Sequence, residues 1–213
     1  MDEDLSIINA NTRNEKIKNF FVNNKKILIS SVIFFILIVI GVYSYDKYST
    51  DKKRQISDNF NAAIIDYSES SKDITLNKLL EIFDQKDPTY SPLSLYFIID
   101  KNLLSDQKEV NKLFDVLIDE ISLDEEIKNL VIYKKALFNA DQANEADLLN
   151  MLNPLINSKS VWKSHAMYLI AEYFYSKNQN QKAKEFFNKI LELNDNQDIV
   201  QQAKKRLSRD LSE

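Results

Sequence analysis

The chain has 213 residues, with 28 Lys and Arg against 32 Asp and Glu, and a formal net charge of −4. It has no cysteine, one histidine and one glycine; disulfides, thiol nucleophiles, multi-histidine zinc sites and glycine-rich phosphate loops are therefore excluded. The acidic balance argues against a nucleic-acid partner, because phosphate binding depends on a basic patch.

An unbroken apolar run extends from Ile27 to Tyr45. Its length of about 19 residues gives a helix of about 28 Å, close to the ~30 Å hydrocarbon core of a bilayer. The run is longer than the apolar part of a secretory signal peptide, about 7 to 15 residues, and no small-x-small cleavage site follows it. A core helix of a soluble domain would be shorter or amphipathic. The run therefore predicts an uncleaved membrane-spanning helix.

The charges on the two sides of this run nearly balance, so orientation depends on position. Lys25 and Lys26 directly abut the span, and long C-terminal domains translocate largely regardless of their charge. In the preceding tail, Ile17, Phe20 and Phe21 predict either a short amphipathic helix on the membrane or a simple lead-in to the span. The sequence thus predicts a cytoplasmic tail (1–26), a membrane span (27–45) and a domain on the opposite side of the membrane (46–213).

The remainder of the chain is net acidic, about −5, and long enough for one domain with a sizeable core. Apolar residues recur at helical spacing throughout, which predicts an all-α domain. The segment from Leu93 to Ile99 could be read as a strand, but it follows Ser91 and Pro92, a helix-start signal, so a buried helix is favoured. The expected helices lie near 46–70, 73–86, 91–104, 106–121, 123–140, 143–157, 160–177, 179–193 and 196–212.

Alternate helices in this series begin near 91, 124 and 160, so helix pairs recur at intervals close to the ~34 residues of tetratricopeptide units. The final pair carries that repeat's packing pattern, in which small residues let two helices approach closely. Its members are Met167, Ile170, Ala171, Phe174, Ala183, Phe187 and Ile190. Asn178 replaces the usual turn glycine, because asparagine tolerates the left-handed conformation. The pattern predicts a tetratricopeptide-like helical-hairpin solenoid closed by a capping helix, with a globular helical bundle as the alternative.

The whole arrangement resembles the ancillary SecYEG translocon subunit family (YfgM-like), particularly its alphaproteobacterial form. The resemblance is carried by the charged tail with Asp2-Glu3-Asp4-Leu5, the single span, the segment from Ala136 to Ala166, the terminal repeat, and Gln202-Ala203-Lys204-Lys205-Arg206-Leu207. It implies a single-pass inner-membrane protein whose periplasmic repeat domain (46–213) is a scaffold that binds the translocon, periplasmic chaperones or emerging secretory proteins. It implies no cofactor, small-molecule substrate or catalytic residue. Because the same repeat domain occurs in envelope proteins that coordinate cell division, a cell-division or envelope-assembly coordinator is the alternative.

In a tetratricopeptide pair, the first helix lines the concave groove with the face opposite its packing stripe. That face predicts a partner-binding set of His165, Tyr168, Glu172 and Tyr175. Tyrosine is enriched at interface hot spots, and Glu172 could pair with a basic partner.

An enzyme would have to use His165 with Glu172, or Ser160 with Lys163. The first pair is separated by about 10 Å along a helix, which is beyond hydrogen-bond reach. Ser160 is expected to cap its helix, and Lys163 is expected to be solvated. The sequence therefore favours a protein that is not an enzyme.

Overall fold

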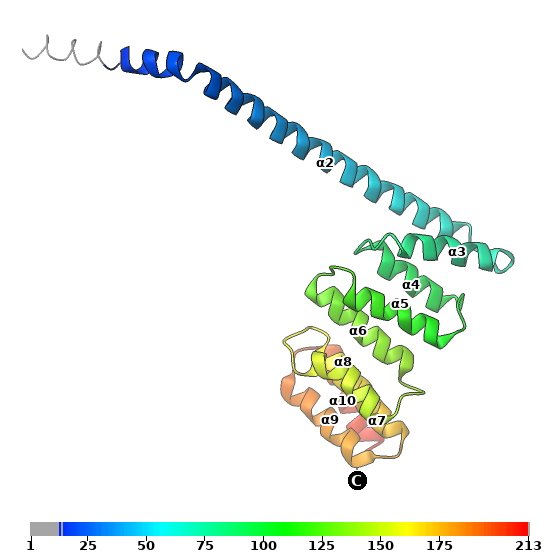
Figure 1. Ribbon diagram of the computed structural model, residues 1–213. Helices are drawn as coiled ribbons and strands as arrows, with labels where there is room; N and C mark the ends of the chain where they lie inside the picture. Colours follow the sequence, from blue (N-terminus) through cyan, green and yellow to red (C-terminus); the bar gives the residue numbers. More distant parts are fainter. Residues whose placement is uncertain (1–12, 14, 213) are drawn as a thin grey trace, which may run out of the picture. The chain divides into compact units, whose positions relative to one another are not determined.

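The computed structural model describes residue 13 and residues 15–212 (Figure 1). Within these residues every regular element is a helix and none is a strand, which confirms the all-α prediction. The motif from Asp2 to Leu5 lies outside the described residues. The chain divides into two compact units, and the division falls between Gln55 and Ile56.

The first unit contains the apolar run. Residues 15–23 are helical, Asn24 forms a turn, and helix α2 (Lys25–Ile65) follows. An 18-residue window of α2 has a mean hydropathy of 2.7, and none of it is buried. This helix near the N-terminus is therefore long and apolar enough to span a membrane.

Helix α2 does not end where the apolar run ends. The sequence predicts a span over 27–45 and a separate helix near 46–70, whereas the structure has one helix that continues to Ile65. No proline or glycine lies between Tyr45 and Ile65, so nothing in the local sequence interrupts the backbone hydrogen bonds. The change from apolar to polar composition alters what surrounds the helix without altering its backbone.

The second unit is built from the end of α2, one 3-10 turn and eight further α-helices. These are η1 (Glu69–Ser71, a 3-10 turn), α3 (Lys72–Phe83), α4 (Tyr90–Asp100), α5 (Gln107–Asp119), α6 (Glu125–Asn139), α7 (Glu145–Ile156), α8 (Lys163–Ser176), α9 (Asn180–Leu193) and α10 (Gln197–Arg209). Helices α3 to α10 pack in chain order, each against the next (Figure 1). The run Leu93 to Ile99 lies in α4, which confirms the helical interpretation.

Three clusters of buried side chains form the core of this unit. One joins Ile56 and Phe60 of α2 to Leu79 and Ile98, and a second centres on Phe114. The largest lies among the last helices and contains every member of the predicted repeat pattern, from Met167 to Ile190. The predicted burial of these positions is confirmed.

Connections in this unit are made without glycine. Lys86, Asn102, Asn178 and Asn194 all have positive φ, between 47° and 59°. Asn178 has φ 59°, so asparagine replaces the turn glycine as predicted. The side chains of Asp106, Asn144 and Asn196 each accept a backbone hydrogen bond at a helix start, which positions α5, α7 and α10.

Candidate protein-interaction site

All four residues of the predicted partner-binding set lie on α8, and all four are half-buried. Their opposite stripe, which includes Ile170, Ala171 and Phe174, packs into the largest core cluster. Tyr168 and Tyr175 also pack against this cluster from its edge. The set is therefore part of the packing between helices as well as part of the surface.

Two of the four residues, Glu172 and Tyr175, contact one side chain, Arg206 of α10. The Arg206 guanidinium donates from Nε to Glu172 Oε1 at 2.7 Å and from Nη2 to Glu172 Oε2 at 2.6 Å. Its Cζ lies 5.0 Å from the centre of the Tyr175 ring, a cation–π arrangement. Tyr168, one turn before Glu172, packs edge-on against Phe187 with the ring centroids 5.5 Å apart. A two-pronged arginine–carboxylate pair is geometrically specific, so it holds α10 in one register against α8.

The same guanidinium also binds the end of its own helix. Arg206 Nη1 donates to Asp210 Oδ2 at 2.8 Å, and Arg209 donates to both oxygens of that carboxylate. Hydrogen bonds first from Arg209 and then from Arg206 hold the pKa of Asp210 well below its usual range. Hydrogen bonds to Glu172 and then to Asp210 raise the pKa of Arg206 above its ordinary value. We call Glu172, Arg206, Arg209 and Asp210 the C-terminal clasp.

The C-terminal clasp limits how far the Glu172 carboxylate is available to a binding partner. The carboxylate and the guanidinium are both only about a quarter exposed, with side-chain exposures of 26% and 27%. The negative charge of Glu172 is already neutralised by Arg206 within the chain, so a basic partner would have to displace Arg206. Partner binding at this face stays a prediction.

His165 lies with a different group of residues. Its ring centroid is 5.1 Å from that of Trp162 and 5.9 Å from that of Tyr133, and Trp162 stacks on Tyr133 at 5.8 Å. The Trp162 Nε1 donates to the Glu126 carbonyl at 3.2 Å, which fixes the indole over α6. The structure therefore places His165 in an aromatic cluster between α6 and α8, apart from the clasp.

Two of the side chains considered for catalysis, Ser160 and Glu172, have structural partners. Ser160 Oγ donates to Glu126 Oε2 at 2.8 Å and accepts from the Trp162 backbone N–H at 3.1 Å. Ser160 thus joins the turn before α8 to the first turn of α6. Glu172, the other half of the pair with His165, is held by Arg206.

Sequence reasoning missed the partners of these residues, although a spacing signal was present. Three side-chain contacts join residues 34 positions apart: Lys86 with Glu120, Glu126 with Ser160, and Glu172 with Arg206. That separation equals the length of one tetratricopeptide unit. A search for complementary polar residues one repeat apart would have found each pair.

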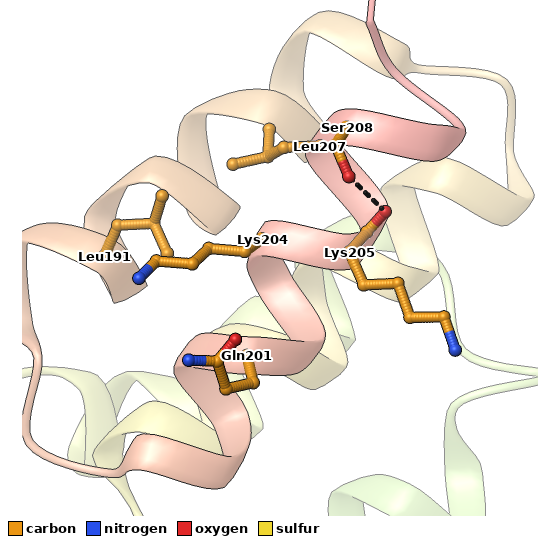
Figure 2. A pocket seen from close by; sticks show the side chains of 6 residues that line it. All are labelled: Leu191, Gln201, Lys204, Lys205, Leu207 and Ser208. Atoms are coloured by element: carbon orange, nitrogen blue, oxygen red, sulfur yellow. Dashed lines mark hydrogen bonds between the residues drawn. The ribbon is translucent and has the colours of Figure 1, made fainter.

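A hollow lies between side chains of α9 and α10. It has a volume of about 770 Å³ and is lined by Leu191, Gln201, Lys204, Lys205, Leu207 and Ser208. Figure 2 shows Lys204 lying beside Leu191, and the Ser208 hydroxyl donates to the Lys205 carbonyl at 3.2 Å. Leu191 and Leu207 are half-buried beneath exposed lysines, the arrangement expected of a polar cap over a terminal apolar face.

No family model, no curated protein and no solved structure matches this chain.

Proposed function

We propose that this protein is a membrane-anchored protein-interaction scaffold, ancillary to the SecYEG translocon, with its helical domain in the periplasm. The observation that carries the proposal is the exposed apolar helix α2, which leads directly into a helical domain. Such a chain combines an anchor with a surface for partners. Its proposed partners are the translocon, periplasmic chaperones and emerging secretory proteins.

The proposed architecture of the domain is a tetratricopeptide-like solenoid. Helices α4, α6 and α8 begin at Tyr90, Glu125 and Lys163, close to one repeat apart. The three contacts between residues 34 apart and the chain-order packing of α3 to α10 support this arrangement. Helix α10 buries Ile199, Val200 and Ala203 against α9 and presents lysines outward, as a capping helix does.

The proposed mechanism is local concentration. An anchor confines the domain near its membrane partner, and this raises the effective concentration of weak binding surfaces without any new contact. The proposed orientation, with the N-terminus in the cytoplasm, rests on Lys25 and Lys26 beside the span. The chain is proposed not to be an enzyme, and the structural partners of Ser160 and Glu172 support this.

Co-purification tests the proposal. The full chain, carrying an affinity tag, is extracted from membranes in mild detergent, and the eluate is examined for translocon subunits. The matched control is residues 56–213 exported to the periplasm without the anchor. We expect translocon subunits with the full chain and far fewer with the control. Recovery of cell-division proteins in place of the translocon would support the alternative role and contradict the proposed one.

A further inference from the structure

Helices α4, α5 and α6 enclose a pocket that the predicted set on α8 does not include. Its volume is about 270 Å³. Apolar side chains from all three helices line it: Ile99, Phe114, Leu137 and Phe138. Phe114 is fully buried and lies 5.9 Å from the Phe138 ring, whereas Leu137 is 50% exposed at the pocket. We call this the α4–α6 pocket.

The size of the pocket limits what it can hold. Sites for drug-sized ligands measure about 300 to 1,000 Å³, so this pocket is below that range. It suits one large apolar side chain. The exposure of Leu137 leaves an apolar surface that such a side chain would cover.

The charges around the pocket are unequal. The ammonium of Lys134 lies 4.6 Å from the centre of the Tyr96 ring, and both residues line the pocket. Asp100, at the same pocket, is paired with Lys101 at 2.8 Å. The neighbouring Lys135 is paired with Asp115, whereas Lys134 makes no ion pair with any described residue. One positive charge beside the pocket is therefore left for a partner.

The Tyr96 hydroxyl adds a second polar group to this wall. It is buried and has no hydrogen-bond partner among the described residues. Burial raises the pKa of Tyr96 to about 12. A buried donor without a partner is unfavourable.

A neighbouring groove of about 320 Å³ between α5, α6 and α7 differs in this respect. There Asn111 and Asn139 donate to each other's side-chain oxygens at 2.9 Å and 2.8 Å. The two asparagine amides of that groove are satisfied within the chain, whereas the Tyr96 hydroxyl of the α4–α6 pocket has no hydrogen-bond partner among the described residues.

We propose that the α4–α6 pocket binds a partner polypeptide through one large apolar side chain that has an acidic residue beside it. The apolar side chain enters between Leu137 and Phe138, and the carboxylate pairs with Lys134. This inference deepens the proposed scaffold function and rests on it, since it names the chemistry by which the domain recognises a client or partner.

The test uses the full chain in dodecylmaltoside micelles and fluorescein-labelled, amidated peptides of Gly and Ser. Each peptide carries one central Phe or Ala flanked on both sides by Asp, Asn or Lys, and binding is measured by fluorescence anisotropy. We expect the Phe peptide with Asp flanks to bind most tightly. Replacing Phe by Ala should weaken binding by about tenfold or more. Lys flanks should weaken it further.

The decisive variant is Lys134→Glu, which should reverse the order so that Lys-flanked Phe peptides bind more tightly than Asp-flanked ones. Leu137→Ser should weaken all Phe peptides without changing their charge order. Lys128→Glu is the matched control, since Lys128 lies on the same helix outside the pocket, and it should leave the charge order unchanged. Urea unfolding followed by Trp162 fluorescence establishes that each variant is folded.

Several results would overturn the proposal: no binding up to about millimolar peptide, equal binding of Phe and Ala peptides, or a charge order that Lys134→Glu does not alter. Sedimentation velocity is run in parallel. A dimer that Leu137→Ser abolishes, without peptide binding, would assign the pocket to a second copy of the chain. Translocon co-purification is measured on the same variants. Failure of the pocket proposal is therefore distinguishable from failure of the proposed scaffold function.

Discussion

Truncation of Phe187 to Ala tests the packing of the final helix pair. Phe187 lies on α9, is fully buried, and contacts the Tyr168 ring of α8 edge-on. Substitution removes a large apolar side chain and leaves a cavity, because the surrounding helices relax only partly. Phe→Ala changes at such sites cost about 3 to 5 kcal/mol, and about 0.5 to 1.5 kcal/mol of this is the aromatic pair.

That cost is large beside the 5 to 15 kcal/mol, roughly, that stabilises a typical domain. With a urea dependence of about 1 to 3 kcal/mol per molar, the unfolding midpoint should fall by roughly 1 to 5 M. The assay is urea unfolding of the full chain in dodecylmaltoside micelles. Trp162 is the only tryptophan and packs against the same core cluster, so its fluorescence reports this region.

Phe186→Ala is the matched control, one residue away on the same helix. Phe186 is only half-buried, with its ring 5.7 Å from Phe174 and the Lys189 ammonium 4.8 Å above it. We expect it to lose less than half as much stability as Phe187→Ala. Equal losses for the two variants, or a loss below about 1 kcal/mol for Phe187→Ala, would refute the packing argument.

Three further predictions concern single positions in the same domain. The clasp holds the pKa of Asp210 below its ordinary value of 3.8, so the stabilisation from ionised Asp210 is complete above pH 3.8 and is lost as the pH falls below it. Asp210→Asn should therefore lower stability at neutral pH and flatten the acid side of a profile of melting temperature against pH. Because Asn178 has φ 59°, Asn178→Gly should leave the urea unfolding midpoint nearly unchanged, whereas Asn178→Val should lower stability by about 1 to 2 kcal/mol. Equal unfolding midpoints for the Gly and Val variants would contradict a left-handed turn at this position. Burial raises the pKa of Tyr96 from 10.0 to about 12, so the protein loses stability as the pH rises through that interval, and Tyr96→Phe should reduce this alkaline loss. At neutral pH the same substitution removes a hydroxyl without a hydrogen-bond partner, so calorimetry should show a gain in stability of about 1 kcal/mol.

The predictions that held were those that depend on neighbours close in the chain. Helical periodicity located the stripe from Met167 to Phe174, and it is buried because side chains three and four apart share one face of a helix. The left-handed turn at Asn178 follows from asparagine's own conformational range. The apolar run identified α2 because its composition is unlike that of any other segment. The predicted end of this helix at residue 45 was wrong, because the apolar run ends well before the helix does at Ile65.

The candidate sites depended on contacts that no local pattern contains. Sequence periodicity placed Glu172 on an outer face of its helix, but only the packing of α10 brought Arg206 against it. Likewise, the α4–α6 pocket exists because α4 and α6 pack with Lys134 over the ring of Tyr96, residues 38 apart in the numbering. Whether a half-buried polar side chain has a hydrogen-bond or ion-pair partner depends on how the helices cross and which side chains they bring into contact. The sequence by itself therefore determined the helices and their buried stripes, whereas the tertiary structure decided which surface charges of the described residues are paired with each other and which are not.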